Sequence, residues 1–431
     1  MKIYAITLGC KVNQYETQAM LGMLTERGYF LCDSETEADV ILLNSCTVTC
    51  TSDQKVRQTL RRARRRNPEA LLILTGCMPQ AFPDAAENLM DADIVTGNAD
   101  HNRLPSLIER FLYTHQRVVA ISPHEKQTGE KFESLQVSDF HERTRAFVKI
   151  EDGCNRFCSY CIIPTARGRV RSRDPEELRA ELAAIAAKGY KEVVLVGINL
   201  SAYGQEWGGD LCDAVEIACQ TEGIERVRLG SLEPDRMTDA VIQRLAQQPK
   251  LCPQFHLSLQ SGCDRTLKAM NRHYSSAEYA EIVAKLRDCF ENVAITTDVM
   301  VGFPQESEED FEESLAFVQK IAFAKVHVFA YSRRPGTVAD RMTGQISKAT
   351  KEERSHRMIA ATDATQAEFL RQQVGKETMV LFETEIFPNV FEGYTPNYTS
   401  VQVPAQENLC GLSRLVRIES AGEDTCIGSL Q

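Results

Sequence analysis

The sequence predicts an α/β protein that contains, in order, a doubly wound parallel sheet, a partly closed parallel (β/α)6 barrel and a small all-β domain. Near the start, short apolar runs alternate with helical stretches, as in a doubly wound sheet. In the middle, six strand-like runs alternate with helical ones, which favours a parallel barrel. At the end, short alternating runs separated by Gly and Asn-Pro turns indicate strands alone.

The first sheet is predicted from three runs that end alike: KIYAITLGC (2–10), ADVILLNSC (38–46) and ALLILTGC (70–77). Short apolar runs bounded by breakers are typical of buried parallel strands. Residues 13–27 and 52–66 between them are expected to be helices, because a Gly or an Asn-Pro pair closes each one. We therefore predict a first domain at 1–113, followed by a polar linker at 114–143.

The barrel is predicted over residues 144–373. Its strands are expected at 146–152, 192–197, 226–231, 255–261, 294–302 and 325–332. Helical stretches follow them. One is expected from Pro175 to Lys188, because Asp174 is a natural N-cap and proline suits the first helical position. The site of a parallel barrel lies at the carboxyl ends of its strands.

The last domain is predicted over residues 374–431 as a small β-barrel or sandwich. Its motifs VGK (374–376) and GYTPNYTSV (393–401) resemble the TRAM domain, an RNA-binding β-module. Three basic residues stand against eight acids here, which argues against broad electrostatic binding of RNA. Stacking of bases stays open for the aromatic residues Phe387, Phe391, Tyr394 and Tyr398.

The composition narrows the class of protein. A hydrophobic content of 43% suffices for buried cores, and a net charge of −11 argues against a general nucleic-acid binder. The amino terminus MKIYAITLGC has no signal-peptide pattern, and no apolar run approaches the length of a membrane helix. We therefore expect a soluble, cytoplasmic protein, in which fifteen cysteines are thiols or metal ligands rather than disulfides.

Three cysteines close the three predicted strands of the first sheet: Cys10, Cys46 and Cys77. Each alone would be an ordinary buried thiol. However, ligands bind beyond the carboxyl ends of the strands in doubly wound sheets. Because the three positions are equivalent, we predict a shared metal site. Nine of the other twelve cysteines show no such regularity, and we expect them to be core or surface thiols.

A basic helix is predicted within this first domain. The stretch QKVRQTLRRARRRNPE (54–69) has no acid before Glu69, and Val56, Leu60 and Ala63 mark its buried face. Such a face is either simply solvated or a contact for a phosphate backbone. Three of its arginines are candidate RNA contacts: Arg61, Arg64 and Arg65.

A second set of cysteines, Cys154, Cys158 and Cys161, follows the first barrel strand in EDGCNRFCSYC (151–161). A structural zinc site requires four ligands, and this loop has three cysteines. The spacing C-x-x-x-C-x-x-C, with Tyr160 before the last cysteine, resembles the radical S-adenosylmethionine (SAM) superfamily. This resemblance implies a [4Fe–4S] cluster held by three thiolates, whose fourth iron binds SAM and whose electron generates a 5′-deoxyadenosyl radical.

The resemblance also suggests that polar residues at the strand ends bind SAM, although each could instead pack at the barrel rim. Besides Tyr160, the candidates are Gly197, Asn199, Ser231, Glu233, Gln260 and Asp298. After the cysteines comes ARGRVRSRDP, in which four arginines alternate and would point the same way in an extended chain. These arginines could form salt bridges with nearby acids. Alternatively, they could contact RNA phosphate or, for the nearest one, the SAM carboxylate. We favour the second interpretation for Arg167, Arg169, Arg171 and Arg173.

The complete layout resembles the methylthiotransferases of the radical-SAM superfamily. This implies two [4Fe–4S] clusters, held by Cys10, Cys46 and Cys77 and by Cys154, Cys158 and Cys161. It also implies SAM, a tRNA substrate, a sulfur donor and an electron donor such as a flavodoxin- or ferredoxin-type protein. An iron–sulfur electron carrier or sensor that binds RNA is the non-enzymatic alternative, but such a protein needs neither an open iron nor a barrel.

The substrate is suggested by TLGCKVNQYE (7–16) and GINLSAYG (197–204). Both resemble the branch that acts on N6-threonylcarbamoyladenosine beside the tRNA anticodon. We therefore expect 2-methylthio-N6-threonylcarbamoyladenosine at position 37, made by methylthiolation of carbon 2. The alternatives are the branches acting on isopentenyladenosine in tRNA or on an aspartate of a ribosomal protein. The base must leave its stack to react, which costs little in an anticodon loop.

Overall fold

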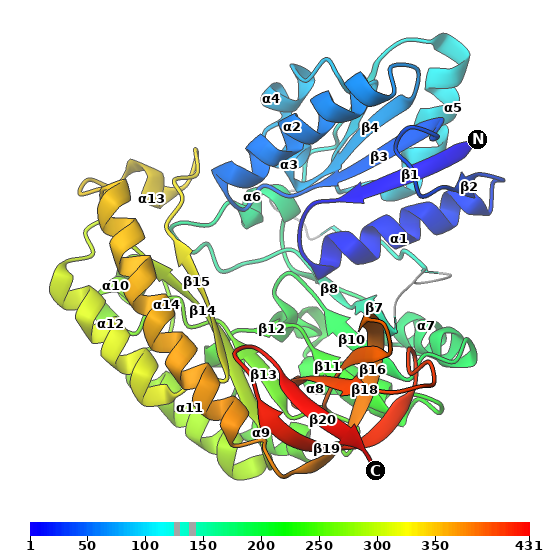
Figure 1. Cartoon of the computed structure of the whole chain (residues 1–431). Coiled ribbons are helices and arrows are strands. Elements are labelled where there is room, and N and C mark those ends of the chain that lie inside the picture. Colours follow the sequence, from blue (N-terminus) through cyan, green and yellow to red (C-terminus); the bar gives the residue numbers. More distant parts are fainter. Residues whose placement is uncertain (125–129, 138–143) are drawn as a thin grey trace.

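The computed structural model describes residues 1–124, 130–137 and 144–431 (Figure 1). Its first domain is a six-stranded, wholly parallel sheet in the order β2-β1-β3-β4-β5-β6. The strands are β1 (Lys2–Thr7), β2 (Phe30–Leu31), β3 (Val40–Ser45), β4 (Leu71–Gly76), β5 (Ile94–Thr96) and β6 (Val118–Ala120). The helices are α1 (Lys11–Thr25), α2 (Cys50–Arg66), α3 (Cys77–Ala81), α4 (Pro83–Glu87) and α5 (Leu104–Thr114). The predicted doubly wound sheet is confirmed.

The helix α1 lies between this sheet and the barrel (Figure 1). Its residues Met20 and Leu24 belong to the core of the sheet, whereas Val12 and Tyr15 belong to the large core of the barrel. Apolar residues on both sides therefore bury the helix between the two domains. This position fixes the start of α1, where Cys10 lies, against the barrel.

The second domain is a partly closed parallel barrel, as predicted. Its strands form two sheets, β11-β10-β7 and β12-β13-β14-β15. They are β7 (Arg145–Lys149), β10 (Glu192–Val196), β11 (Arg226–Leu229), β12 (Ser231–Leu232), β13 (Gln254–Leu257), β14 (Ala294–Val301) and β15 (Lys325–Ala330). The third predicted strand is thus interrupted at Gly230. A short antiparallel pair, β8 (Glu151–Asp152) and β9 (Arg171–Ser172), flanks the cysteine loop.

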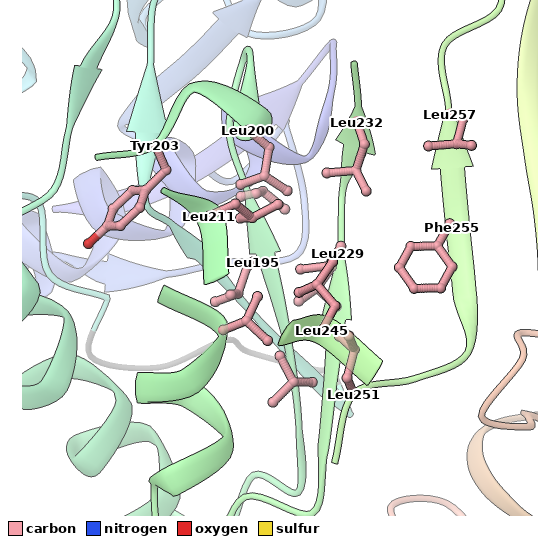
Figure 2. Packing of buried hydrophobic residues seen from close by; sticks show 14 of the residues in the cluster. Leu195, Leu200, Tyr203, Leu211, Leu229, Leu232, Leu245, Leu251, Phe255 and Leu257 are labelled. Atoms are coloured by element: carbon pink, nitrogen blue, oxygen red, sulfur yellow. The ribbon is translucent and has the colours of Figure 1, made fainter. Parts of the chain in front are cut away.

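Helices cover the outside of the barrel, and apolar side chains fill the space between helices and strands. Figure 2 shows this packing, in which Leu195, Leu229 and Phe255 point from the strands toward Leu211 and Leu245 on the helices. The helices between β9 and the third domain are α7 (Pro175–Ala187), α8 (Leu211–Gln220), α9 (Asp239–Ala246), α10 (Asp264–Ala269), α11 (Ser276–Cys289), α12 (Glu308–Ile321), α13 (Val338–Arg341) and α14 (Lys348–Arg371), and the short α6 (Ile163–Arg167) lies instead beside the first domain. Asp174 caps α7 as predicted, by accepting from the backbone of Glu176 and Glu177. Short 3₁₀ turns lie at His101–Arg103, Leu200–Ala202, Gln205–Trp207 and Pro234–Arg236.

The third domain is a closed five-stranded barrel, which confirms the expected small all-β domain. Its strands are β16 (Glu377–Phe387), β17 (Val390–Tyr394), β18 (Ser400–Pro404), β19 (Ser413–Ala421) and β20 (Cys426–Leu430), in the order β16-β17-β18-β20-β19. It is held against the large barrel by Arg228, whose guanidinium donates to the carbonyl groups of Pro396 (3.0 Å) and Thr395 (3.3 Å). Its aromatic pair Tyr394 and Tyr398 is stacked at that contact.

The predicted linker at 114–143 differs from a simple connector. It contains β6, and Leu135 and Val137 are buried in the core of the barrel. The hydroxyl of Tyr15 on α1 donates to the Leu135 carbonyl at 2.5 Å. Residues 125–129 and 138–143 of this segment lie outside the described residues. In the described part of the chain, no helix is long and apolar enough to cross a membrane.

Candidate functional site

The first cysteine triad, Cys10, Cys46 and Cys77, lies at one edge of the first sheet. The register pairs Thr7 with Asn44 and Asn44 with Thr75, so that β1, β3 and β4 end side by side and the cysteines follow. Burial is the main reason that the pKa of Cys46 and the pKa of Cys77 are raised, and the charge of Cys10 adds to both shifts, so the thiols lie within electrostatic range of one another. The sequence-based expectation that topology brings them together is therefore met by their positions.

A buried amide holds this edge in shape. The Asn13 side chain donates to Asn44 Oδ1 at 3.1 Å and to the Ser45 carbonyl at 3.3 Å, and its own oxygen accepts from the Cys10 backbone at 3.3 Å. Asn13 is 1% exposed. One side chain thus joins the loops that carry Cys10 and Cys46.

The second triad, Cys154, Cys158 and Cys161, lies on one loop after the first barrel strand. Gly153 begins this loop with φ +86°, and a Cβ there would collide with the carbonyl oxygen of Arg169. Burial raises the pKa of Cys161 to about 12 and also raises that of Cys154, and the neighbouring cysteines add to both shifts. Three thiols on one tight loop are therefore packed within mutual electrostatic range.

Each triad has a sulfur that is contacted by an arginine, and the two arginines are different residues. Arg167 Nε lies 3.2 Å from Cys77 Sγ, and Arg272 Nη1 lies 3.3 Å from Cys158 Sγ. Burial raises the pKa of Cys77 to about 12, although the charge of Arg167 opposes this shift. An N–H donor beside each triad stabilises a negatively charged sulfur. Arg272, which lies 114 residues from its cysteine, was not found from the sequence, where nothing links the two.

These features fit an iron–sulfur cluster at each triad. Cysteine thiolates are the usual ligands of such clusters, and hydrogen bonds to the sulfurs tune them. The donor sets consist of three thiols, with arginine N–H groups rather than carboxylates at the sulfurs. A harder ion such as Mg²⁺ or Ca²⁺ would prefer oxygen ligands.

The two triads lie on either side of one short helix. The helix α6 begins two residues after Cys161 and ends at Arg167, the residue that contacts Cys77. Five helical residues extend only about 7.5 Å. Asn98 strengthens the same junction, since its amide donates to the Ala166 carbonyl at 2.8 Å. The fold therefore brings the two cysteine sites to one domain interface.

Two candidate SAM residues, Gly197 and Asn199, surround a buried carboxyl group. The backbone N–H of Asn199 donates to Glu151 Oε2 at 2.7 Å, and a Cβ at Gly197 would lie 2.7 Å from the same oxygen. Burial raises the pKa of Glu151 well above its ordinary value. Among the described residues, neither Glu151 Oε1 nor Asn199 Oδ1 has a hydrogen-bond partner. Two orphaned oxygens beside the cysteine loop suit a ligand with N–H donors, such as the ammonium group of SAM.

The other candidates lie around the second triad and the barrel interior. Glu233 pairs with Arg272 at 2.6 Å, and Tyr160 packs beside Met270 and Phe303. Gln260 has φ +69° and joins β14 through its backbone, donating to the Asp298 carbonyl at 2.9 Å. Ser231 and Asp298 line a cavity inside the barrel.

This cavity has a volume of about 690 Å³ and is bounded by the barrel, the third domain and the start of α1. His256, Asp298 and His327 lie on its wall, with their ligand atoms within 4.8 Å of one another. His256 Nε2 lies 3.4 Å from Asp298, and His256 Nδ1 lies 3.0 Å from the Thr296 hydroxyl. These groups could hold a divalent cation, and they also offer the hydrogen bonds that a planar base requires.

Lys11 enters the same cavity from the first domain and is exposed to it. Its side chain makes no hydrogen bond or ion pair with any residue in the described ranges. Burial, with the charges of Arg145 and Arg228, lowers the pKa of Lys11 to about 8. The cavity thus contains an unpaired cation beside the first triad.

The prediction that the arginines at 167–173 form one basic edge for RNA is wrong for three of the four. Arg167, Arg171 and Arg173 are buried (0%, 5% and 1% exposed), so RNA phosphate cannot reach them. Arg167 pairs with Glu16 of α1 and Arg173 with Glu181. The helix α6 and the turn after it break the extended chain that the prediction assumed. Only Arg169 of the four is exposed, and its guanidinium lies over the Phe157 ring.

The basic face of α2 is partly as predicted. Arg61 and Arg65 are exposed, whereas Arg64 is half-buried and donates to Asp93 at 2.6 Å and to the Asp91 and Ala70 carbonyls. Arg64 therefore stabilises the first domain, and the prediction that it contacts RNA is wrong. The buried face is formed by Val56, Leu60 and Ala63, as expected.

Family models match two parts of the chain. A model described as the radical SAM superfamily matches residues 148–318, and one described as uncharacterized protein family UPF0004 matches residues 2–97. The matched segments contain all six cysteines of the two triads. The fold of the barrel is shared with solved structures. The radical S-adenosylmethionine methyltransferase TsrM from Kitasatospora setae has a TM-score of 0.59 at 12% identity, over 84% of this chain and 89% of that one.

Curated relatives match nearly the whole chain. The threonylcarbamoyladenosine tRNA methylthiotransferase MtaB of Bacillus subtilis is 40% identical, over 96% of this chain and 93% of the relative. Its namesake from Thermotoga maritima is 37% identical, over 98% and 95%. A tRNA-2-methylthio-N(6)-dimethylallyladenosine synthase from Pelotomaculum thermopropionicum is 36% identical, over 89% and 87%. With its three-cysteine barrel loop and its preceding parallel sheet, this chain belongs to the radical-SAM tRNA methylthiotransferase family.

Proposed function

We propose that this enzyme methylthiolates carbon 2 of N6-threonylcarbamoyladenosine at position 37 of tRNA, using two [4Fe–4S] clusters. The observation that carries the two-cluster proposal is the short helix α6, which joins the triad of Cys154, Cys158 and Cys161 to Arg167 and Cys77 of the other triad. The threonylcarbamoyl substrate is supported by the names of the relatives from Bacillus subtilis and Thermotoga maritima, which match over nearly their full lengths.

The clusters and SAM, when bound, would supply the one-electron chemistry and carry the sulfur. In the proposal, the chain itself contributes the six thiolates and the two arginines that contact them. Glu151, Asn199 and Gly197 form the cradle for the SAM ammonium group, and Tyr160, Ser231, Glu233, Gln260 and Asp298 complete the SAM site. The 690 Å³ cavity inside the barrel has the size of a small-molecule site and would receive the flipped nucleoside.

The domain division that we propose is 1–113, 144–373 and 374–431, with the segment between the first two packed against both. Exposed Arg61, Arg65 and Arg169 are the proposed contacts for the tRNA backbone. Because the reaction consumes electrons and sulfur, we propose an electron donor of the flavodoxin or ferredoxin type and a separate sulfur donor. A reducing cytoplasm is the proposed location, since none of the fifteen cysteines forms a disulfide.

The substrate is tested with purified, anaerobically reconstituted enzyme, SAM, a reductant and a sulfide source. Three forms of one tRNA, with N6-threonylcarbamoyladenosine, isopentenyladenosine or adenosine at position 37, are used as substrates, and the products are compared by mass spectrometry. We expect a methylthio product from the first tRNA only. A product from the isopentenyladenosine tRNA would instead favour the second candidate, which the 36%-identical dimethylallyladenosine synthase supports.

A further inference from the structure

The cations on the wall of the barrel cavity are matched by nearby groups, with one exception. Arg228 donates to Glu192 Oε1 at 2.8 Å and to two backbone carbonyls of the third domain. Lys325 lies 3.6 Å from Asp424. Lys11 has no such partner in the described part of the chain, because the acid that acts on it, Glu192, is already paired with Arg228. A single cation is therefore available to a ligand.

The position of Lys11 does not help the fold. Lys11 is the first residue of the 15-residue helix α1, whose first turn has no acidic residue. The amino terminus of a helix carries a partial positive charge, so a cation there is unfavourable. The guanidinium groups of Arg145 and Arg228 repel it further. Because Lys11 is exposed to a cavity and lies near these positive charges, an anion from outside the chain would stabilise its ammonium group.

The cavity restricts what this anion can be. Its volume of about 690 Å³ suits a nucleoside, and His256 and His327 on the same wall offer hydrogen bonds to a base. Lys11 directly follows Cys10, the first residue of the first triad. A base whose carbon 2 faces the cysteines would present the substituent on its N6 nitrogen within reach of a long side chain from the same loop.

We propose that Lys11 is the specificity-determining residue that binds the carboxylate of the N6 substituent of the target adenosine. The inference rests on the proposed function, which supplies the carboxylate. Isopentenyladenosine and adenosine have no such group, so that Lys11 would be left buried without an anion when either of them occupies the cavity. This desolvation cost would discriminate against both.

Binding of anticodon stem-loops to the cluster-loaded, SAM-bound protein, followed by fluorescence anisotropy, tests the proposal. Three loops are used at position 37: N6-threonylcarbamoyladenosine, its carboxyl methyl ester and adenosine. The wild-type protein should bind the free acid at least tenfold more tightly than the ester. Equal affinities for acid and ester would overturn the proposal without the need for any variant.

The variant arm compares Lys11→Met with Lys325→Met, since Lys325 lines the same cavity but already has an acidic partner. Lys11→Met should lose about tenfold in affinity for the free acid and nothing for the ester, and Lys11→Arg should restore binding. Lys325→Met should change neither. Equal losses for all three loops would assign Lys11 to the RNA backbone and overturn the proposal. Tight, carboxylate-dependent binding without methylthio product would instead contradict the proposed function.

Discussion

Replacing Glu16 by Gln should strongly weaken the junction between the first domain and the barrel. Glu16 is 0% exposed on α1, and its carboxylate accepts from Lys149 at 2.7 Å and from Arg167 Nη2 at 3.0 Å, both across the interface. The variant leaves two buried cations with one remaining acid, Asp152. Removing one partner of a buried pair costs about 3 to 5 kcal/mol.

The pKa of Glu16 gives a second estimate of this cost. Burial alone would raise that pKa, but Arg167 and Lys149 hold it at about 2, below the ordinary value of 4.5. This lowering of the pKa corresponds to roughly 3 kcal/mol at pH 7. Because the folded-state pKa is lowered, this stability is present above pH 4.5 and is lost as the pH falls toward 2. By linkage, about 1 kcal/mol remains at pH 3.

Urea unfolding of the cluster-free protein measures this effect. With a slope of about 3 kcal/mol per molar urea, Glu16→Gln should lower the midpoint by about 1 M at pH 7 and by less than half of that at pH 3. The control is Glu37→Gln, since Glu37 forms an exposed pair with Lys2 at 3.2 Å and should cost under about 1 kcal/mol. Equal shifts for the two variants, or a Glu16 shift that does not change with pH, would refute the reasoning.

Three further predictions concern the clusters and the RNA. The reconstituted wild-type protein should hold about eight irons per chain. Replacing all three cysteines of either triad should leave about half of this iron. Full iron content in a variant that lacks Cys10, Cys46 and Cys77 would rule out the first cluster. Arg272→Gln removes an N–H donor to Cys158 Sγ and should make the reduction potential of the barrel cluster more negative. This potential is measured in a redox titration followed by electron paramagnetic resonance. As a control, Arg167→Gln should leave it unchanged. Reversing the charges of Arg61 and Arg65 should reduce the log–log salt dependence of tRNA binding by about 0.7 to 0.9 per lost contact, and an unchanged slope would mean that this face is only solvated.

The positions of the cysteines followed from the sequence because they depend on local rules. Parallel strands present their carboxyl ends at one edge, so Cys10, Cys46 and Cys77 had to meet there once the three strands were recognised. The spacing of Cys154, Cys158 and Cys161 places them on one loop whatever the surroundings are. Both inferences used only neighbouring residues and a general topology.

The arginines could not be placed in this way, because their partners lie far away in the sequence. Glu16 is 151 residues from Arg167, and Asp93 is 29 residues from Arg64. A run of like charges looks the same from the sequence whether acids from other elements cover it or solvent does. The cradle around Glu151 and the contact of Arg272 with Cys158 were missed for the same reason.

Mass spectrometry of the modified nucleosides in tRNA from cells that lack this protein would decide whether it makes the proposed product. We expect that 2-methylthio-N6-threonylcarbamoyladenosine disappears and that N6-threonylcarbamoyladenosine accumulates in its place. A plasmid carrying the wild-type gene should restore the product, and one with Cys154, Cys158 and Cys161 replaced should not. Undiminished 2-methylthio-N6-threonylcarbamoyladenosine, together with loss of the methylthio group from isopentenyladenosine or from a ribosomal protein, would show that the enzyme acts on another substrate.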